Sequence, residues 1–364
     1  MKLTIPVKDL SQALATAVLA VEKKSTIPVL SNVKLEAKGG KLYLDASDLE
    51  RWISLSIPCN VEKEGSITVP AKRMADYFNL LPHADATLES TPAMKLTVKC
   101  VKSRTALPGM SVENFPERPR FNEKDVKRYT IPGSWLSQIQ SRVGFAIANE
   151  ESRYTLIAAL IEFKGALLIA TSTDGHRLSQ TKFKNGVPFD EQGKSLVPKA
   201  SLDIAARLFG SAESASIAFE TNHVVIEANG YTLITRKLSG NFPDYERVLP
   251  SKAPHVVEIK REELMASLAR VTKFADAMQA VKMAINGDLK LSAANNGGDA
   301  EETVTYSGEA SGMFGIKSTY VHDFLRAVGC ADVQMRFTDH ESAIEFREGG
   351  GDDSYRYVVM PMRV

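Results

Sequence analysis

The sequence predicts an α+β protein built from three repeated modules, each with two helices packed against antiparallel sheets. Two observations predict this fold. The chain has 364 residues, which at about 100–150 residues per domain suggests two or three domains. Similar stretches also recur along it, with matching leucines at Leu10, Leu136 and Leu264, spaced 126 and 128 residues apart. Self-similarity at a fixed period is the signature of a repeat architecture.

Each module is expected to start with a short strand followed by an amphipathic helix. The three copies read LTIPVKDLSQAL, YTIPGSWLSQIQ and VEIKREELMASL. In the first copy Leu10, Leu14, Val18 and Val21 recur at steps of three and four residues. This is the period of one buried stripe along an α-helix, and the other copies keep it.

A hairpin and a second helix follow in each module. The hairpins are NVKLEAKGGKLYLDAS, AALIEFKGALLIATST and AVKMAINGDLKLSAAN, in which Gly40, Gly165 and Gly287 supply the positive φ of a tight turn. The second helices are predicted in VPAKRMADYFNLL, VPKASLDIAARLF and KSTYVHDFLRAV. More strands close the modules, and Asn229-Gly230 is a strong hairpin signal among them.

We therefore expect three domains, covering residues 1–125, 126–253 and 254–364. The linkers are expected near Asn122–Lys127 and Ser251–His255. The first two copies close alike, on ENFPE and GNFPD.

Composition excludes several classes of protein. The 45 Lys and Arg residues against 44 Asp and Glu give a net charge of +1, so no global field attracts nucleic acid or an anionic membrane. Cys59, Cys100 and Cys330 are widely spaced without a CxxC pair, which argues against a disulfide framework or a zinc site. The start MKLTIPVKDLSQ does not resemble a signal peptide, and no run approaches about 18 apolar residues. We expect a cytoplasmic protein without a cofactor.

The predicted helices carry sparse basic residues opposite their apolar stripes. For any single one, an ordinary solvated helix surface is the favoured interpretation. Their recurrence on all three modules suits loose contact with phosphates, which adds salt-dependent affinity but reads no base. These residues are Lys72, Arg73, Arg142, Lys199, Arg207, Arg270, Lys273 and Arg326.

Three stretches together resemble the bacterial sliding clamp family, the beta subunit of DNA polymerase III. They are TSTDGHRLSQ (Thr171–Gln180), GNFPDYERVLP (Gly240–Pro250) and the terminal YVVMPMRV, and the resemblance covers the full length. It implies a head-to-tail homodimer of six modules that encircles double-stranded DNA and tethers DNA polymerase and repair proteins. Helices would line the hole, and a clamp loader would open the ring. A ring stays on DNA by topology, so the near-neutral charge fits this function.

The resemblance also implies a pocket for short linear motifs of partner proteins, between the second and third domains. Methionines suit such a site because their flexible side chains adapt to different partners. A competing interpretation is that VVMPM is only a last strand that fills the core of the third module. The implied pocket residues are Leu156, Thr173, Gly175, His176, Arg177, Leu178, Pro243, Arg247, Val248, Val358, Val359, Met360, Pro361, Met362 and Arg363.

The resemblance implies two further surfaces, and the first of them includes basic residues of the predicted helices. The expected DNA-binding residues are Lys24, Lys72, Arg73, Arg142, Arg153, Tyr154, Lys199 and Arg207, and the acids of Asn149–Ser152 lie near the same path. The strand around Lys99–Leu107 should meet the third domain of a second copy. The expected interface residues are Lys102, Arg104, Thr105, Lys273, Phe274, Glu301 and Glu302.

Two alternatives come from other functional classes. Asp174 and His176 could form a catalytic pair of a hydrolase with a serine nucleophile. However, no G-x-S-x-G elbow, phosphate-binding glycine loop or metal-ligand cluster accompanies them in the sequence. The chain could also be a repeat scaffold that binds only proteins. We predict a non-enzymatic clamp.

Overall fold

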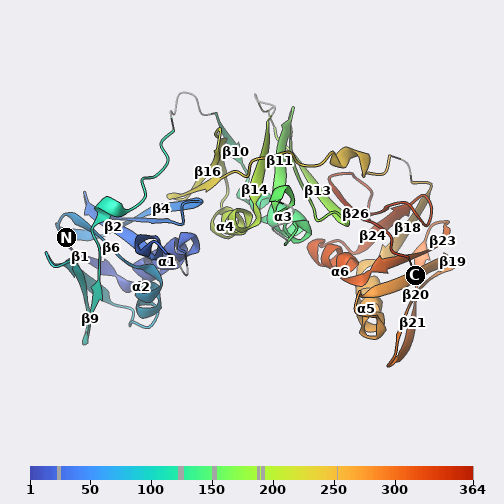
Figure 1. The fold of residues 1–364 in the computed structure, drawn as a ribbon, viewed down its shortest axis with the longest axis horizontal. Helices are drawn as coiled ribbons and strands as arrows, with labels where there is room; N and C mark the ends of the chain where they lie inside the picture. The colour runs from blue at the N-terminus through green and yellow to red at the C-terminus, as the bar shows by residue number, and fades with distance from the viewer. Residues whose placement is uncertain are drawn as a thin grey trace. The chain divides into compact units, whose positions relative to one another are not determined.

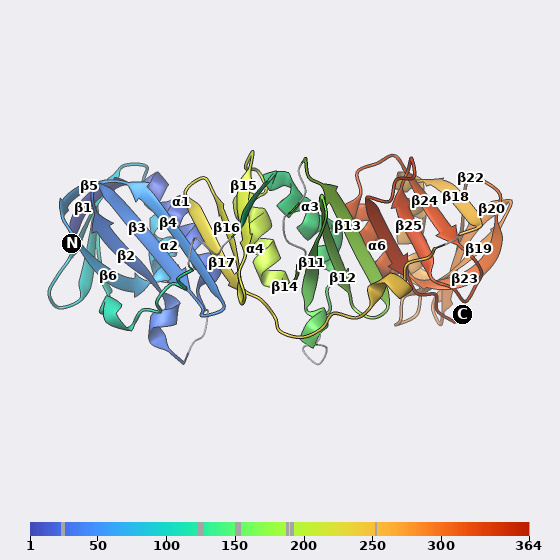
Figure 2. The ribbon, with the colours of Figure 1, turned by 90° about the horizontal axis from the view of Figure 1, so that it is seen from above.

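The computed structural model describes residues 1–22, 26–121, 127–149, 154–186, 189, 193–251 and 253–363. The chain divides into two compact units. The first contains Met1–Ser137 and Ile204–Lys237, and the second contains Gln138–Asp203 and Leu238–Val364. Figures 1 and 2 show the strands and helices of both units.

The first unit contains two antiparallel sheets. The smaller has the order β5 (Asn60–Lys63), β1 (Lys2–Pro6), β7 (Asp85–Ser90), β8 (Lys95–Cys100), β9 (Ser103–Pro108). The larger has the order β10 (Arg128–Ile131), β15 (Ala215–Phe219), β16 (His223–Ala228), β17 (Tyr231–Arg236), β4 (Arg51–Pro58), β3 (Lys41–Ser47), β2 (Asn32–Lys38), β6 (Gly65–Pro70). Helices α1 (Val7–Ala17) and α2 (Ala71–Phe78) contact each other, and α1 packs on β3 and β4.

The second unit also has a large and a small sheet. The large one has the order β14 (Lys194–Pro198), β11 (Ala158–Lys164), β12 (Leu167–Thr173), β13 (Arg177–Lys184), β26 (Tyr355–Val359), β25 (Ile344–Glu348), β24 (Asp332–Phe337), β18 (His255–Lys260), β22 (Tyr306–Ser307). The small one has the order β21 (Gly298–Val304), β20 (Asp288–Asn295), β19 (Ala280–Asn286), β23 (Ser311–Lys317). The remaining α-helices are α3 (Gly133–Val143), α4 (Lys199–Phe209), α5 (Arg261–Val271) and α6 (Ser318–Ala327).

The hairpins predicted from the sequence are confirmed, and so is the first part of the helical stripe, whereas Val18 and Val21 at its end are only half-buried. Leu10 and Leu14 on α1 are fully buried, as are Leu264 and Leu268 on α5. The α-helix nevertheless ends at Ala17, and Val18 begins a 3₁₀ turn, η1 (Val18–Ala20). The predicted helix was therefore one turn too long, because a 3₁₀ turn tightens the end of the helix.

The predicted turn residues adopt the left-handed backbone conformation. Gly40, Gly165 and Gly287 have φ of +74°, +59° and +80°, and they connect β2–β3, β11–β12 and β19–β20. Asn229 and Gly230 have φ of +52° and +79° between β16 and β17, as a two-residue type I′ hairpin requires.

The last strand is held on both sides. β26 pairs with β13 through Leu178–Val358 and with β25 through Phe346–Tyr357. Tyr355 and Tyr357 each stack on Phe324 of α6, with ring centroids 5.7 Å and 5.5 Å apart. The terminal run is therefore an ordered strand, and its odd-numbered residues fill the core of the third module.

The described ranges contain neither a membrane-spanning helix nor a cluster of potential metal ligands. None of the helices found there has the length and hydropathy needed to cross a bilayer. Within the same residues, no three His, Cys, Asp or Glu side chains gather as metal ligands would.

Candidate functional site

The turn between β12 and β13 is closed by the side chains of Asp174 and Thr173. Asp174 Oδ1 accepts hydrogen bonds from the backbone N–H groups of His176 (3.0 Å) and Arg177 (3.1 Å). Thr173 Oγ1 accepts one from the N–H of Gly175 (3.1 Å) and donates to the carbonyl of Arg177 (2.6 Å). Gly175 has φ of +91°, which favours glycine there. The short stretch Thr173–Arg177 thus encodes its own turn.

The same contacts argue against the catalytic pair. Asp174 Oδ2 accepts from Nε of Arg177 at 2.9 Å, so both carboxylate oxygens bind the turn and the guanidinium. In a catalytic triad the carboxylate instead orients the imidazole through Nδ1. The hydrogen bond to His176 comes from its backbone, so the geometry is that of a structural turn.

The segment after β26 runs beside this turn. The N–H of Met360 donates to the carbonyl of His176 (2.9 Å), and the N–H of Met362 donates to Gly315 of β23 (2.8 Å). Val358 and Val359 are buried at 1% and 0% exposure, whereas Met360 is 42% exposed. The accessible part of the terminal run therefore begins at Met360, and the two valines lie behind it.

The segment that connects β17 to β18 forms the third side of this candidate site, next to the β12–β13 turn and the segment after β26. Its 3₁₀ turn, η6 (Tyr245–Arg247), leaves Pro243, Arg247 and Val248 exposed. Tyr245 is buried against Leu178 and Val358. Leu156, at 9% exposure, is also largely buried.

Tyr245 anchors this connector through a buried hydrogen bond. Its hydroxyl donates to Oε2 of Glu162 at 2.5 Å. Burial, together with this hydrogen bond, raises the pKa of Tyr245 above its ordinary value, so the hydroxyl stays protonated and donates.

Replacing Tyr245 with Phe is expected to lower the free energy of unfolding by about 1–3 kcal/mol, because the Glu162 carboxylate loses a buried donor. Urea titration measures this. Tyr43→Phe is the matched control, since Tyr43 is 41% exposed, and it should change stability by less than about 0.5 kcal/mol. Equal stabilities of the Tyr245→Phe variant and the unmodified chain would contradict the anchoring role.

Beside the terminal run lies a hollow that the sequence did not predict. Its walls are Lys282, Met313, Phe314, Gly315, His340 and Glu341 together with Pro361, Met362 and Arg363. Met313 is 55% exposed. These residues come from β19, from β23, from the loop between β24 and β25, and from the segment after β26, so no local pattern in the sequence connects them.

The predicted DNA-binding residues separate into distinct groups. Lys72, Arg73 and Arg207 are exposed, Tyr154 is 53% exposed, and Lys199 is half-buried. Lys24, Arg153 and the acids Glu150 and Glu151 lie outside the described residues.

Arg142 is turned into the protein. Its Nη2 donates to Glu348 at 3.0 Å, and its guanidinium lies 4.9 Å from the ring centroid of Tyr355. The helical period places it on the polar face of α3, but the fold covers that position with β26. We therefore do not assign Arg142 to a DNA-binding surface.

Five of the seven predicted dimer residues lie on or next to two sheet edges. Lys102 is in the turn before β9, Arg104 and Thr105 are on β9, and Glu301 and Glu302 are on β21. β9 and β21 are outer strands of their sheets within the described chain. Lys273 is exposed and Phe274 half-buried, in η7 (Thr272–Phe274).

The structure adds two features at these edges. Val101, between β8 and β9, is 75% exposed with φ of +50°, and sequence reasoning missed it. Glu302 is held by Arg270 through two hydrogen bonds of 2.7 Å, and Glu301 lies 3.3 Å from Lys290.

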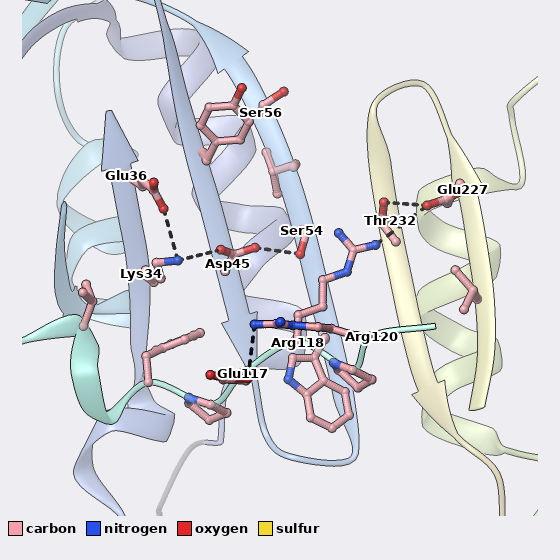
Figure 3. A pocket seen from close by; sticks show the side chains of 18 of the residues that line it. Lys34, Glu36, Asp45, Ser54, Ser56, Glu117, Arg118, Arg120, Glu227 and Thr232 are labelled. Carbon is pink, nitrogen blue, oxygen red and sulfur yellow. Dashed lines mark hydrogen bonds and ion pairs between the residues drawn. The ribbon is translucent and has the colours of Figure 1, made fainter. Parts of the chain in front are cut away.

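The first unit has a hollow of its own, which Figure 3 shows. It lies over β2, β3 and β4, next to β16 and β17, and the segment 112–121 crosses it. Lys34 pairs with Glu36 (3.2 Å) and Asp45 (3.5 Å), and Arg128 pairs with Glu227 (2.6 Å). Five basic and five acidic residues line it, so its charge is balanced, and no predicted site uses it.

Family models of the DNA polymerase III beta subunit match almost the whole chain. The N-terminal, central and C-terminal domain models match residues 1–119, 130–244 and 246–363. The chain belongs to the DNA polymerase III beta subunit family. The beta sliding clamp of Pseudomonas aeruginosa is 31% identical over 373 residues, and that of Escherichia coli K12 is 27% identical over 370, with full coverage of both chains in each case.

Solved structures of beta subunits have the same fold. The crystal structure of a DnaN sliding clamp from Pseudomonas aeruginosa, bound to griselimycin, is 30% identical with a TM-score of 0.94, and both chains are fully covered. The beta sliding clamp of C. crescentus is 28% identical with a TM-score of 0.93, covering 100% of this chain and 99% of that one.

Membership of the beta subunit family confirms the predicted three-module α+β fold and the sliding-clamp function. It also identifies the chain as a non-catalytic processivity subunit. The hydrolase and scaffold alternatives receive no support.

Proposed function

We propose that two copies of this chain join head to tail into a closed ring that encircles duplex DNA in the cytoplasm. The ring slides along DNA and tethers polymerases and repair proteins, which bind by short linear motifs. Each copy supplies three modules, with boundaries near residues 125 and 253. No step of this function requires a cofactor of the clamp.

The pairing of equivalent strands carries this proposal. In the first unit β4 of module one pairs with β17, the last strand of module two. In the second unit β13, the counterpart of β4, pairs with β26, the last strand of module three. In module three the counterpart of β4 and β13 is β21, and in module one the counterpart of β17 and β26 is β9. Both β21 and β9 are outer strands of their sheets in the described chain. Pairing β21 of one copy with β9 of the other repeats the same junction, and two such contacts close a ring.

Charge complementarity supports the same contact. The β8–β9 hairpin carries Lys99, Lys102 and Arg104, and β21 carries Asp299, Glu301 and Glu302. Opposite potentials favour the correct partner and register.

Weak DNA contact fits a ring. Exposed Lys72, Arg73 and Arg207 supply sparse positive charge on α2 and α4, while the whole chain carries only +1. Each phosphate contact adds salt-dependent affinity, and few of them leave the ring free to move. Tethering then raises the effective concentration of a bound polymerase at the primer end.

Retention on circular and linear DNA tests this function. Protein assembled with a clamp loader should stay on nicked circular duplex at moderate salt and leave after the circle is linearised. Lys102→Glu/Arg104→Glu, expected to be monomeric, is the control and should not be retained. Equal retention on circles and linear DNA would contradict a ring.

A further inference from the structure

We propose that Asp323 of α6 is a positioning residue for the partner-binding site, acting through Arg177. This inference rests on the proposed function, in which partners bind to the β12–β13 turn and Met360–Arg363. It concerns how those two elements are held in place. Asp323 lies 146 residues from Arg177 in the sequence.

Arg177 is bound at every nitrogen of its guanidinium. Nε donates to Asp174 (2.9 Å), Nη1 donates to Oδ2 of Asp323 (2.6 Å), and Nη2 donates to the carbonyl of Phe145 (2.6 Å). Its side chain is only 10% exposed, and the guanidinium lies 4.4 Å from the ring centroid of Tyr320. Arg177 thus connects the turn to α6 and to the 3₁₀ turn η4 (Gly144–Ala146) after α3, and its charge is paired with Asp174 and Asp323.

A chain of hydrogen bonds that includes backbone groups links the Asp323–Arg177 contact to the partner-binding site. Asp174 binds the guanidinium of Arg177 and also closes the turn through the N–H groups of His176 and Arg177. The carbonyl of His176 then accepts the N–H of Met360. Moving the guanidinium therefore moves both the turn and the first exposed residue of the terminal run.

α6 is a rigid support for this contact. Val321, Phe324 and Leu325 flank Asp323 in the helix and are fully buried. Asp323 itself is 30% exposed, at the edge of the packed region. A carboxylate on a packed helix fixes the planar guanidinium more closely than a flexible partner would.

The first module provides an internal comparison. Asp48 binds the N–H and Nε of Arg51 (2.7 Å and 2.9 Å), as Asp174 binds Arg177. The N–H of Arg236 donates to the backbone carbonyl of Glu50 (2.8 Å), as that of Met360 donates to the carbonyl of His176. The side chain of Arg51 is 24% exposed, and its hydrogen bonds go to Asp48. The turn of module one therefore closes without a carboxylate from a helix. Asp323 is thus not needed to form the turn around Arg177, and its task is to fix the position of the Arg177 guanidinium.

The experiment measures binding of a fluorescein-labelled peptide that carries the clamp-binding motif of a replicative polymerase. Asp323→Ala should lower affinity about five- to tenfold, since a charge-assisted hydrogen bond is lost. Ala favours helix, so α6 should remain folded. Asp323→Asn keeps an acceptor and should lose less. The matched control is Asp332→Ala, which breaks an ion pair to Lys260 of 2.8 Å in the same module and should leave affinity unchanged.

A double-mutant cycle with Arg177→Lys separates positioning from a general loss of structure. If Asp323 acts through Arg177, Asp323→Ala should cost little more in the Arg177→Lys background. Amide NMR shifts of Gly175 and His176 should change in Asp323→Ala and not in Asp332→Ala. Unchanged affinity in Asp323→Ala, or an equal loss in both backgrounds, overturns the inference. Absence of peptide binding by the unmodified chain would instead overturn the proposed function. If Asp323→Ala lowers the unfolding temperature, Asp323→Asn takes its place in the double-mutant cycle with Arg177→Lys, and the same outcomes support or overturn the inference.

Discussion

A chain that ends at Val359 is expected to bind polymerase-derived peptides at least about a hundredfold more weakly than the full chain, because binding energy concentrates in a few anchoring residues. The deletion removes the exposed run that begins at Met360 and the hydrogen bond from its N–H to His176. It keeps β26, so Val358 and Val359 still fill their cores. Fluorescence anisotropy measures the affinity.

Two measurements show whether this loss is specific. The mass in solution should remain that of a dimer, since β9 and β21 are untouched by the deletion. Met94→Ala is a suitable control, because Met94 is 43% exposed and lies between β7 and β8 in the first unit, and this variant should bind the peptide normally. Peptide affinity unchanged by the deletion would rule out a role for the terminal run.

Reversing two charges on the β9 edge is expected to dissociate the dimer. In Lys102→Glu/Arg104→Glu, each of the two changed residues loses its attraction to the acids of β21 in the second copy and is repelled by them instead. Each lost attraction or added repulsion between exposed charges costs up to about 1 kcal/mol. A total loss of about 3 kcal/mol in binding free energy raises the dissociation constant of the dimer about a hundredfold. Analytical ultracentrifugation over a range of concentrations measures it.

Two further measurements test this interface: the dependence of dimerisation on ionic strength, and association between two variants with complementary charge reversals. The dimer of the unmodified chain should weaken as ionic strength rises, because exposed pairs are screened. Mixing the reversed chain with Glu301→Lys/Glu302→Lys should partly restore association. The restoration is partial because that variant also breaks the internal pairs with Lys290 and Arg270. A reversed chain that dimerises as strongly as the unmodified one would exclude β9 as the interface.

The sequence predicted the elements of the fold well, because each depends on neighbours a few residues away. The buried stripe of Leu10 and Leu14 and the left-handed turn at Asn229-Gly230 are local signals, and both are confirmed. The Asp174–Arg177 part of the candidate site is local too, since one carboxylate closes a turn of four residues.

The remaining features depended on contacts that no local pattern contains. Helical period suggested that Arg142 was solvated, but β26 covers it and Glu348 binds it. The terminal run was predicted from the sequence as one stretch, but packing on both faces of β26 buries Val359 in the core of the third module and Val358 against Leu178 and Tyr245, and it leaves Met360 accessible.

The sequence by itself determined that the chain consists of three alike modules and where their helices and hairpins lie, because side-chain periodicity and turn stereochemistry act over short distances. Only the tertiary structure decided that β26 pairs with β13 and that Asp323 meets Arg177. Those contacts join segments more than a hundred residues apart, and the packing of whole sheets and helices selects them.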